Sequence, residues 1–149
     1  MLAEVMREPA YGAYRARLEA LLEIPTDATA LEIHEIIQIG FQADRLMQLC
    51  EMGEVTPLER DQIIPLKTLK TRVARDQKLT VDESDRLFRA AHITAMAEAL
   101  FGNNEKAKRW LSKPKDRFSG KSPMAMLSTI EGTRQVEEML IQLAEGFAF

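Results

Sequence analysis

One stretch of this sequence, residues 80 to 100, constrains the fold more than any other. It begins with Thr80-Val-Asp-Glu83, a capping box in which the threonine and glutamate side chains satisfy backbone N–H groups at the helix start. No proline or glycine follows until Gly102, a residue that suits a left-handed helix stop. We therefore predict a long helix from Thr80 to about Leu100. One face is rich in alanine, which lets neighbouring helices approach closely: Ala90, Ala91, Ala95, Ala97 and Ala99.

Helix start and stop signals also divide the rest of the chain. Residues 31–41, LEIHEIIQIGF, are ambiguous, because their apolar residues alternate as in a strand but also fit a helix stopped by Gly40. We favour a helix, since no partner strand is visible elsewhere, and so expect an all-α fold. The other predicted helices are 9–23, 43–52, 57–64, 65–77, 105–111, 123–129 and 133–145, the last with Gly132 and Thr133 at its start.

The composition is that of an ordinary globular protein, with 46% apolar and 29% charged residues. The single cysteine, Cys50, excludes an internal disulfide and fits a reducing compartment. No run of about 20 apolar residues exists to span a membrane, and residues 1–20 lack the pattern of a signal peptide. We expect a cytoplasmic protein that does not enter a membrane.

Catalytic patterns are missing from the sequence. The two histidines, His34 and His92, have no cysteine or histidine at metal-ligand spacing. There is no glycine-rich phosphate loop, nucleophile elbow or CxxC motif. Glu137 and Glu138 are adjacent, so on a helix their side chains diverge instead of forming an acid–base pair. We expect no enzyme activity, no metal and no cofactor.

Two basic segments stand out in a chain of net charge -3. Residues 64–78 carry five Lys or Arg against one acidic residue, and residues 104–121 carry seven against two. Each could bind an anion such as a phosphate backbone, or could be a solvated helix face. Helices 57–64 and 65–77 have the dimensions of a helix-turn-helix, whose second helix enters the major groove. The candidate DNA contacts are Lys67, Thr68, Lys70, Thr71, Arg72 and Arg75.

Residues 66–91, LKTLKTRVARDQKLTVDESDRLFRAA, resemble the end of the helix-turn-helix part of the Xre/MbcA/ParS antitoxins. The matching features are Thr68-Leu69 and the Ser84-Asp85-Arg86-Leu87 pattern. The C-terminal part is similar to the toxin-binding domain of that family. It supplies, in order, Phe101-Gly102, Ala107, Trp110-Leu111, Pro114, Gly120, Pro123, Leu127, Thr129, Gly132, Val136 and Gly146.

The resemblance implies an Xre-like helix-turn-helix bundle at 28–100, fused through a long helix to a small helical toxin-binding domain at 101–149. Residues 1–27 would be an N-terminal extension. The implied function is that of a type II antitoxin, which inhibits a RES- or ParT-like toxin that degrades NAD or transfers ADP-ribose. It would also repress its own operon by binding operator DNA as a homodimer.

An inhibitor of such a toxin needs a protrusion that enters a nucleotide-shaped cleft, and the chain end has that form. The candidate toxin contacts are Leu143, Gly146, Phe147, Ala148 and Phe149, and a frayed or core-packed terminus is the alternative. Trp110 is expected to pack inward with Leu111 as a scaffold residue. Two rival classes stay open: a stand-alone helix-turn-helix regulator without a toxin, and a small enzyme.

Overall fold

In the computed structural model, which describes residues 6–7 and 9–146, all regular secondary structure of these residues is helical. Two isolated β-bridges, Gln42 with Lys78 and Lys115 with Lys121, join neighbouring loops without forming a sheet. The predicted all-α fold is confirmed. In chain order the elements are α2 (Ala10–Leu22), α3 (Ala30–Ile39), α4 (Ala43–Glu51), α5 (Pro57–Ile63), α6 (Leu66–Ala74), α7 (Val81–Phe101), α8 (Asn104–Ser112), the 3-10 helices η1 (Asp116–Phe118) and η2 (Met124–Ser128), and α9 (Ile130–Ala144).

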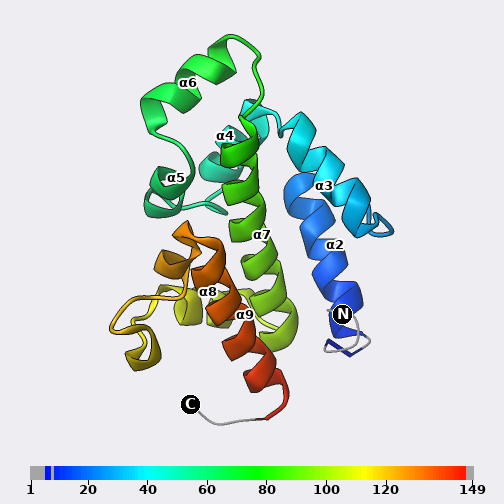
Figure 1. The fold of residues 1–149 in the computed structure, drawn as a ribbon, viewed down its shortest axis with the longest axis vertical. Coiled ribbons are helices and arrows are strands. Elements are labelled where there is room, and N and C mark those ends of the chain that lie inside the picture. Colours follow the sequence, from blue (N-terminus) through cyan, green and yellow to red (C-terminus); the bar gives the residue numbers. More distant parts are fainter. Residues whose placement is uncertain (1–5, 8, 147–149) are drawn as a thin grey trace.

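The long helix α7 is the centre of the molecule, and α2, α3, α5, α8, α9 and η2 all pack against it (Figure 1). Its predicted capping box is present: Thr80 Oγ1 accepts from the N–H of Glu83, whose carboxylate accepts from the N–H of Thr80. Gly102, at φ 65°, ends the helix as predicted. Ala95 and Ala97 are fully buried, so small side chains bring the surrounding helices close to the α7 backbone.

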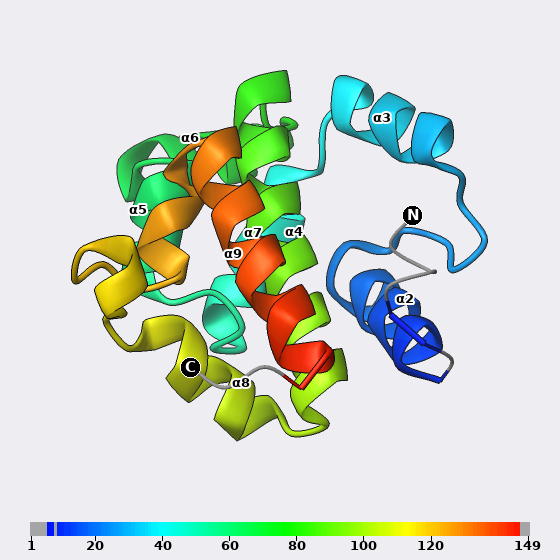
Figure 2. The same cartoon turned by 60° about the horizontal axis from the view of Figure 1, so that its bottom comes forward.

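The N-terminal helix α2 lies along α7, on a different side from α9 (Figure 2). Leu18 and Ile24 are fully buried in the common core. Arg17 connects α2 to two other segments, with ion pairs of 2.6 Å to Glu54 and 2.6 Å to Glu98. Residues 10–24 therefore contribute directly to the core around α7.

The ambiguous segment 31–41 is helical, as predicted. Thr29 and Glu32 form a second capping box at the start of α3. Gly40 ends the helix at φ 95°, and a Cβ there would lie 2.5 Å from the carbonyl oxygen of Leu79. The apolar residues alternate as in a strand because α3 carries some of them on its solvent side. The helix has no fully buried residue: one side faces α7, and Leu31 and Ile39 are 66% and 65% exposed.

Helices α4, α5 and α6 follow in short succession, and α6 packs against α4. The helix expected over 65–77 ends three residues early, at Ala74. Asp76 adopts φ 52°, and the next residues turn to bond the start of α4, where Ala43 N–H donates to Gln77 C=O. These loop bonds replace the last predicted turn of the helix.

The last helix begins earlier than the sequence indicated. Thr129 caps α9 by accepting from the N–H of Gly132, so Gly132 and Thr133 lie inside the helix and do not precede it. Gly132 is buried, and a Cβ there would lie 1.9 Å from the carbonyl oxygen of Met126 in η2. The glycine is needed for close packing, whereas we had interpreted it as a helix boundary.

Candidate functional site

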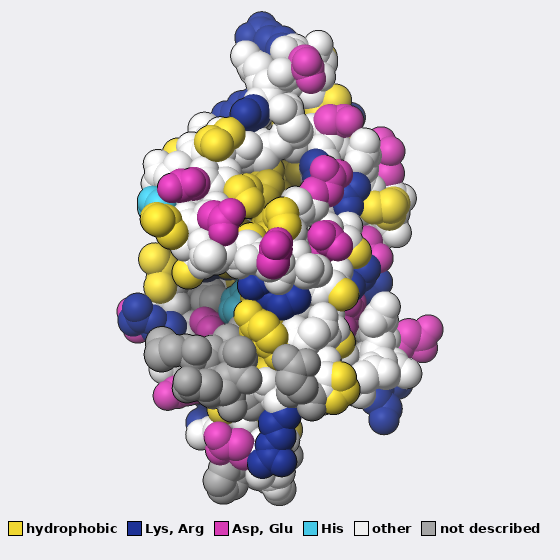
Figure 3. Space-filling view, turned by 90° about the vertical axis from the view of Figure 1, so that its right-hand side faces the viewer, with side chains coloured by type: hydrophobic (Ala, Val, Ile, Leu, Met, Phe, Trp, Pro, Cys, Tyr) yellow, Lys and Arg dark blue, Asp and Glu magenta, His cyan; other side chains and the backbone are white. Residues whose placement is uncertain are grey.

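Helix α6 protrudes at one end of the molecule (Figure 1), where Lys or Arg side chains also gather in the space-filling view (Figure 3). Its fully buried Leu69 holds it in place, while most of its polar side chains face outward. Of the six candidate DNA contacts, four are exposed and two, Thr68 and Arg72, are half-buried; the exposed ones are Lys67, Lys70, Thr71 and Arg75. The surface that α6 offers is thus basic and accessible.

Arg72 differs from the other candidates because it already has an anionic partner. Its guanidinium pairs with the carboxylate of Glu83, the same group that caps α7. Although partial burial opposes the change, the hydrogen bonds from Arg72 and Thr80 lower the pKa of Glu83. Arg72 therefore joins α6 to the start of α7 within the free protein.

The Ser84-Asp85-Arg86-Leu87 pattern fixes the loops around α6. Ser84 Oγ accepts a 3.0 Å hydrogen bond from the N–H of Phe41, at the turn before α4. Arg86 donates two hydrogen bonds, of 3.2 and 2.9 Å, to the carbonyl oxygen of Ile63, the last residue of α5. Sequence reasoning found these residues as a family pattern but missed their role in holding the turn between α5 and α6.

Arg89, one turn further along α7, reaches the C-terminal part of the chain. It pairs with Asp85 and donates to the carbonyl oxygen of Leu127 in η2 at 3.3 Å. Because Thr129, the cap of α9, follows two residues later, this contact helps to place the start of α9. Polar side chains of α7 therefore reach the turn before α4, the end of α5 and η2.

Helix α9 carries the candidate toxin contacts. Its inner face packs on α7 through fully buried Val136 and Leu140, while Leu143 is half-buried and Gly146 exposed, at φ 88°. The other three candidates, Phe147, Ala148 and Phe149, lie outside the described residues. The structure thus defines the helix that leads to the tail.

A histidine joins α9 to the rest of the core. His92 Nε2 lies 3.3 Å from Glu137 Oε2 in α9, and His92 Nδ1 lies 2.7 Å from the hydroxyl of Tyr14 in α2. Phe88 stacks on the ring, with centroids 5.9 Å apart. The two ring nitrogens of His92 thus connect α7 to α2 and to α9, so this histidine has a structural role.

Trp110 lies at the edge of the core in α8. The expected inward packing is complete for Leu111, which is 2% exposed, but Trp110 itself is half-buried. Its ring lies 5.8 Å from that of Phe101, and Lys115 Nζ lies 4.9 Å from the ring centroid. The indole joins α8 to the end of α7 and to the following loop, which fits a scaffold residue.

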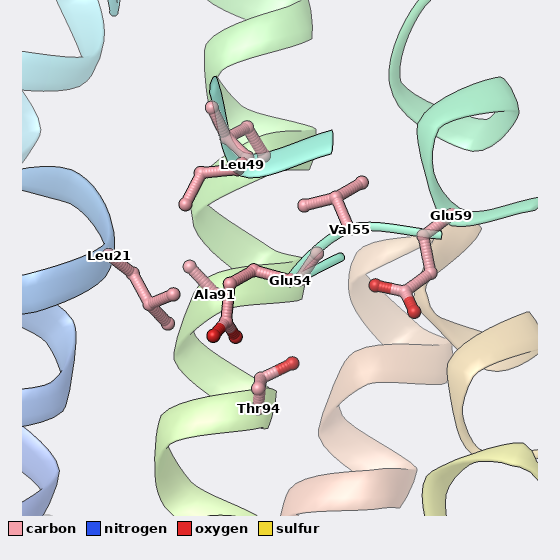
Figure 4. A pocket seen from close by; sticks show the side chains of 9 residues that line it. Leu21, Leu49, Glu54, Val55, Glu59, Ala91 and Thr94 are labelled. Carbon is pink, nitrogen blue, oxygen red and sulfur yellow. The ribbon is translucent and has the colours of Figure 1, made fainter. Parts of the chain in front are cut away.

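Two hollows lie next to the loop between α4 and α5. The smaller is lined by Leu21, Glu54, Glu59 and Thr94 (Figure 4), and its volume of about 10 Å³ is enough for a single water molecule. Burial raises the pKa of Glu59, against hydrogen bonds from Thr56 and the charge of Lys108. The larger is a groove of about 860 Å³ between α5 and α8.

The described residues contain no group of three or more His, Cys, Asp or Glu side chains that could hold a metal ion. In the same part of the chain, no helix combines the length and apolarity needed to cross a membrane.

Comparisons with known proteins match both the whole chain and its C-terminal part. Residues 96–146 match the family described as "Antitoxin Xre/MbcA/ParS C-terminal toxin-binding domain". A Pseudomonas putida protein named Antitoxin Xre is 67% identical over 147 residues, covering 99% of this chain and 92% of that protein. A Yersinia enterocolitica protein of the same name is 29% identical over 113 residues, covering 74% of this chain and 76% of that one.

Proposed function

Since this chain belongs to the Xre/MbcA/ParS family of antitoxins, it is the antitoxin of a toxin–antitoxin system, and we propose that it blocks a RES- or ParT-like toxin with its C-terminal segment. The toxin would be an enzyme that degrades NAD or transfers ADP-ribose from it. The observation that carries the proposal is the course of α9, which is anchored along α7, ends at Ala144 and is followed by the exposed Gly146. A rigid helix followed by a short apolar tail suits insertion into a nucleotide-shaped cleft.

In this proposal Leu143, Gly146, Phe147, Ala148 and Phe149 lie at or beside the NAD site of the toxin. The anchoring of α9 along α7 lowers the entropic cost of binding, because the helix is already held in place before the toxin binds. The two phenylalanines provide the apolar area, and Gly146 allows the backbone to change direction after the helix.

The test is NAD consumption by the purified toxin in the presence of full-length and shortened antitoxin. Deleting residues 146–149 is expected to abolish inhibition while α9 stays folded. Replacing Phe147 and Phe149 together by Ala should weaken inhibition, and Glu138→Ala, at an exposed residue of α9 outside the candidate contacts, serves as the control. Full inhibition by the shortened protein would refute the blocking role of the tail.

We further propose that α6 binds operator DNA and that two copies of the chain repress their own operon. The exposed Lys67, Lys70, Thr71 and Arg75 support this function, since such side chains commonly contact phosphates and base edges. A homodimer would present two α6 helices about 34 Å apart, one turn of DNA. Thr68 and Arg72 would then help to orient the helix.

Operator binding can be measured in a salt series with DNA from upstream of the gene. Replacing Lys70 and Arg75 by Ala should weaken binding and reduce the salt slope by about 0.9 per lost phosphate contact. The matched control replaces Lys106 and Lys113, which are exposed lysines away from α6. An unchanged slope in the α6 variant would rule out this helix as the DNA-binding element.

A further inference from the structure

The groove between α5 and α8 is open to solvent and has a volume of about 860 Å³. Leu111 lies at its base, and Leu58 and Met124 contribute apolar surface from the two sides. Leu58 is 79% exposed, the highest value among the large apolar side chains of the described residues. Together with Leu111 and Met124, this leucine gives the groove an apolar lining of the kind that another molecule commonly covers.

The two walls of this groove carry opposite charges. The α8 side bears Lys108 and Arg109, which form no ion pair within the described residues. The α5 side bears Glu54, Glu59 and Asp61. On this acidic side Glu54 is already paired with Arg17, and Asp61 with Arg60. Lys108 and Arg109 therefore remain available to an occupant, and a segment with an apolar face and an acidic edge would complement the groove.

The size and position of the groove indicate which partner fits. An α-helix is about 10 Å across and rises about 5.4 Å per turn, so roughly two turns would fill this volume. One wall, from α8 and η2, lies inside the span that matches the toxin-binding domain. The groove is therefore continuous with the part of the chain whose partner is the toxin.

We infer that the groove between α5 and α8 binds an amphipathic helical segment of the toxin, about two turns long, at a site separate from the C-terminal tail. Its apolar face would cover Leu58, Leu111 and Met124, and its acidic edge would meet Lys108 and Arg109, as in other helix-in-groove complexes. This inference rests on the proposed function, because it requires the toxin as the partner.

The first test measures the affinity of the full-length antitoxin for purified toxin by calorimetry. Leu58→Glu and the double variant Lys108→Glu with Arg109→Glu should each weaken binding tenfold or more. Their controls are Leu31→Glu, at a leucine 66% exposed on α3, and Lys106→Glu with Lys113→Glu outside the groove. The controls should change affinity less than twofold, and melting temperatures should show that all variants fold.

A photo-crosslinking residue in place of Leu58 identifies the occupant directly. A product with an amphipathic toxin peptide that carries acidic residues supports the inference, whereas a product with any other toxin peptide, with a second antitoxin chain, or no product, overturns it. The inference is also overturned if the groove variants bind the toxin as tightly as their controls do. In that case the proposed function remains intact as long as the wild-type antitoxin still inhibits the toxin. A wild-type protein that binds no toxin would overturn both.

Discussion

At the scale of single residues, Arg17 is expected to contribute to stability through its two ion pairs. Its guanidinium compensates two carboxylates, and Glu98 is only 6% exposed, with Oε1 lacking a hydrogen-bond partner within the described residues. Removing one partner of such a pair leaves an uncompensated charge in a poorly solvated place. Because Arg17 is itself partly exposed, the loss is smaller than in a fully buried pair.

Arg17→Ala is expected to lower the free energy of unfolding by about 2 kcal/mol, measured in urea. Adding Glu98→Gln should restore part of that loss, since it removes the buried charge. Equal stability of Arg17→Ala and the wild type would show that solvent compensates Glu98 without the arginine.

The lowered pKa of Glu83 gives a pH-dependent prediction. Its folded pKa lies below the ordinary value of 4.5, so its contribution to stability is complete above about pH 4.5 and is lost as the pH falls through the folded pKa. Arg72→Ala should therefore destabilise the protein near neutral pH and reduce the loss between pH 5 and pH 3. Urea unfolding over this range checks the difference, and parallel pH curves for the two proteins would contradict it.

Arg17 and Arg72 also show which contacts could not be predicted from the sequence. The capping boxes at Thr29 and Thr80 involve neighbours three residues apart, and the one at Thr80 was predicted. Arg17 and Glu98 are 81 residues apart, and no local pattern indicates that they meet. The exposed basic residues of α6 could be predicted as candidate contacts from the sequence. The ion pair between Arg72 and Glu83 could be seen only in the folded structure.

At the scale of elements, the contact between η2 and α9 depends on Gly132. Gly132→Ala would bring a Cβ to within 1.9 Å of a backbone oxygen, which only a shift of η2 or α9 can relieve. We expect a loss of about 2 kcal/mol in unfolding free energy. Gly120→Ala is the control, because its φ of 84° is strained but nothing lies within 4 Å.

The contact between η2 and α9 also shows why the start of α9 was predicted wrongly. Helix periodicity and a glycine stop gave α7 and α3 nearly to the residue, since both signals are local. For α9 the glycine was interpreted as a boundary, although its role is to admit Met126 of η2. A glycine required by tertiary packing cannot be distinguished from a helix stop without its neighbour.

At the scale of the whole molecule, the N-terminal part is expected to be essential for folding. Helix α2 and the residues after it bury apolar side chains against α7, each worth about 2 kcal/mol: Leu18, Leu21, Leu22 and Ile24. Their sum is comparable with the total stability of an ordinary domain. The match to the Pseudomonas putida protein covers 99% of this chain and so includes most of this segment.

A protein lacking residues 1–27 should therefore lose cooperative thermal unfolding, measured by circular dichroism and calorimetry. Removing residues 1–5 alone is the control. A truncated protein that melts cooperatively near the wild-type temperature would support the interpretation of 1–27 as a separable extension. The boundary after residue 27, like the one between residues 100 and 101, stays a prediction until this experiment is done.

Three of the polar side chains that α7 directs at its neighbours, Ser84, Arg86 and Arg89, have a consequence for how this chain can change over time. Each lies at a fixed angle around one helix, and adding a single residue would rotate everything beyond it by about 100°. Surface loops generally tolerate added residues better than helices do, whereas the number of residues in this stretch of α7 has to stay constant. Substitution, and not insertion or deletion, is the route by which the helix can diversify.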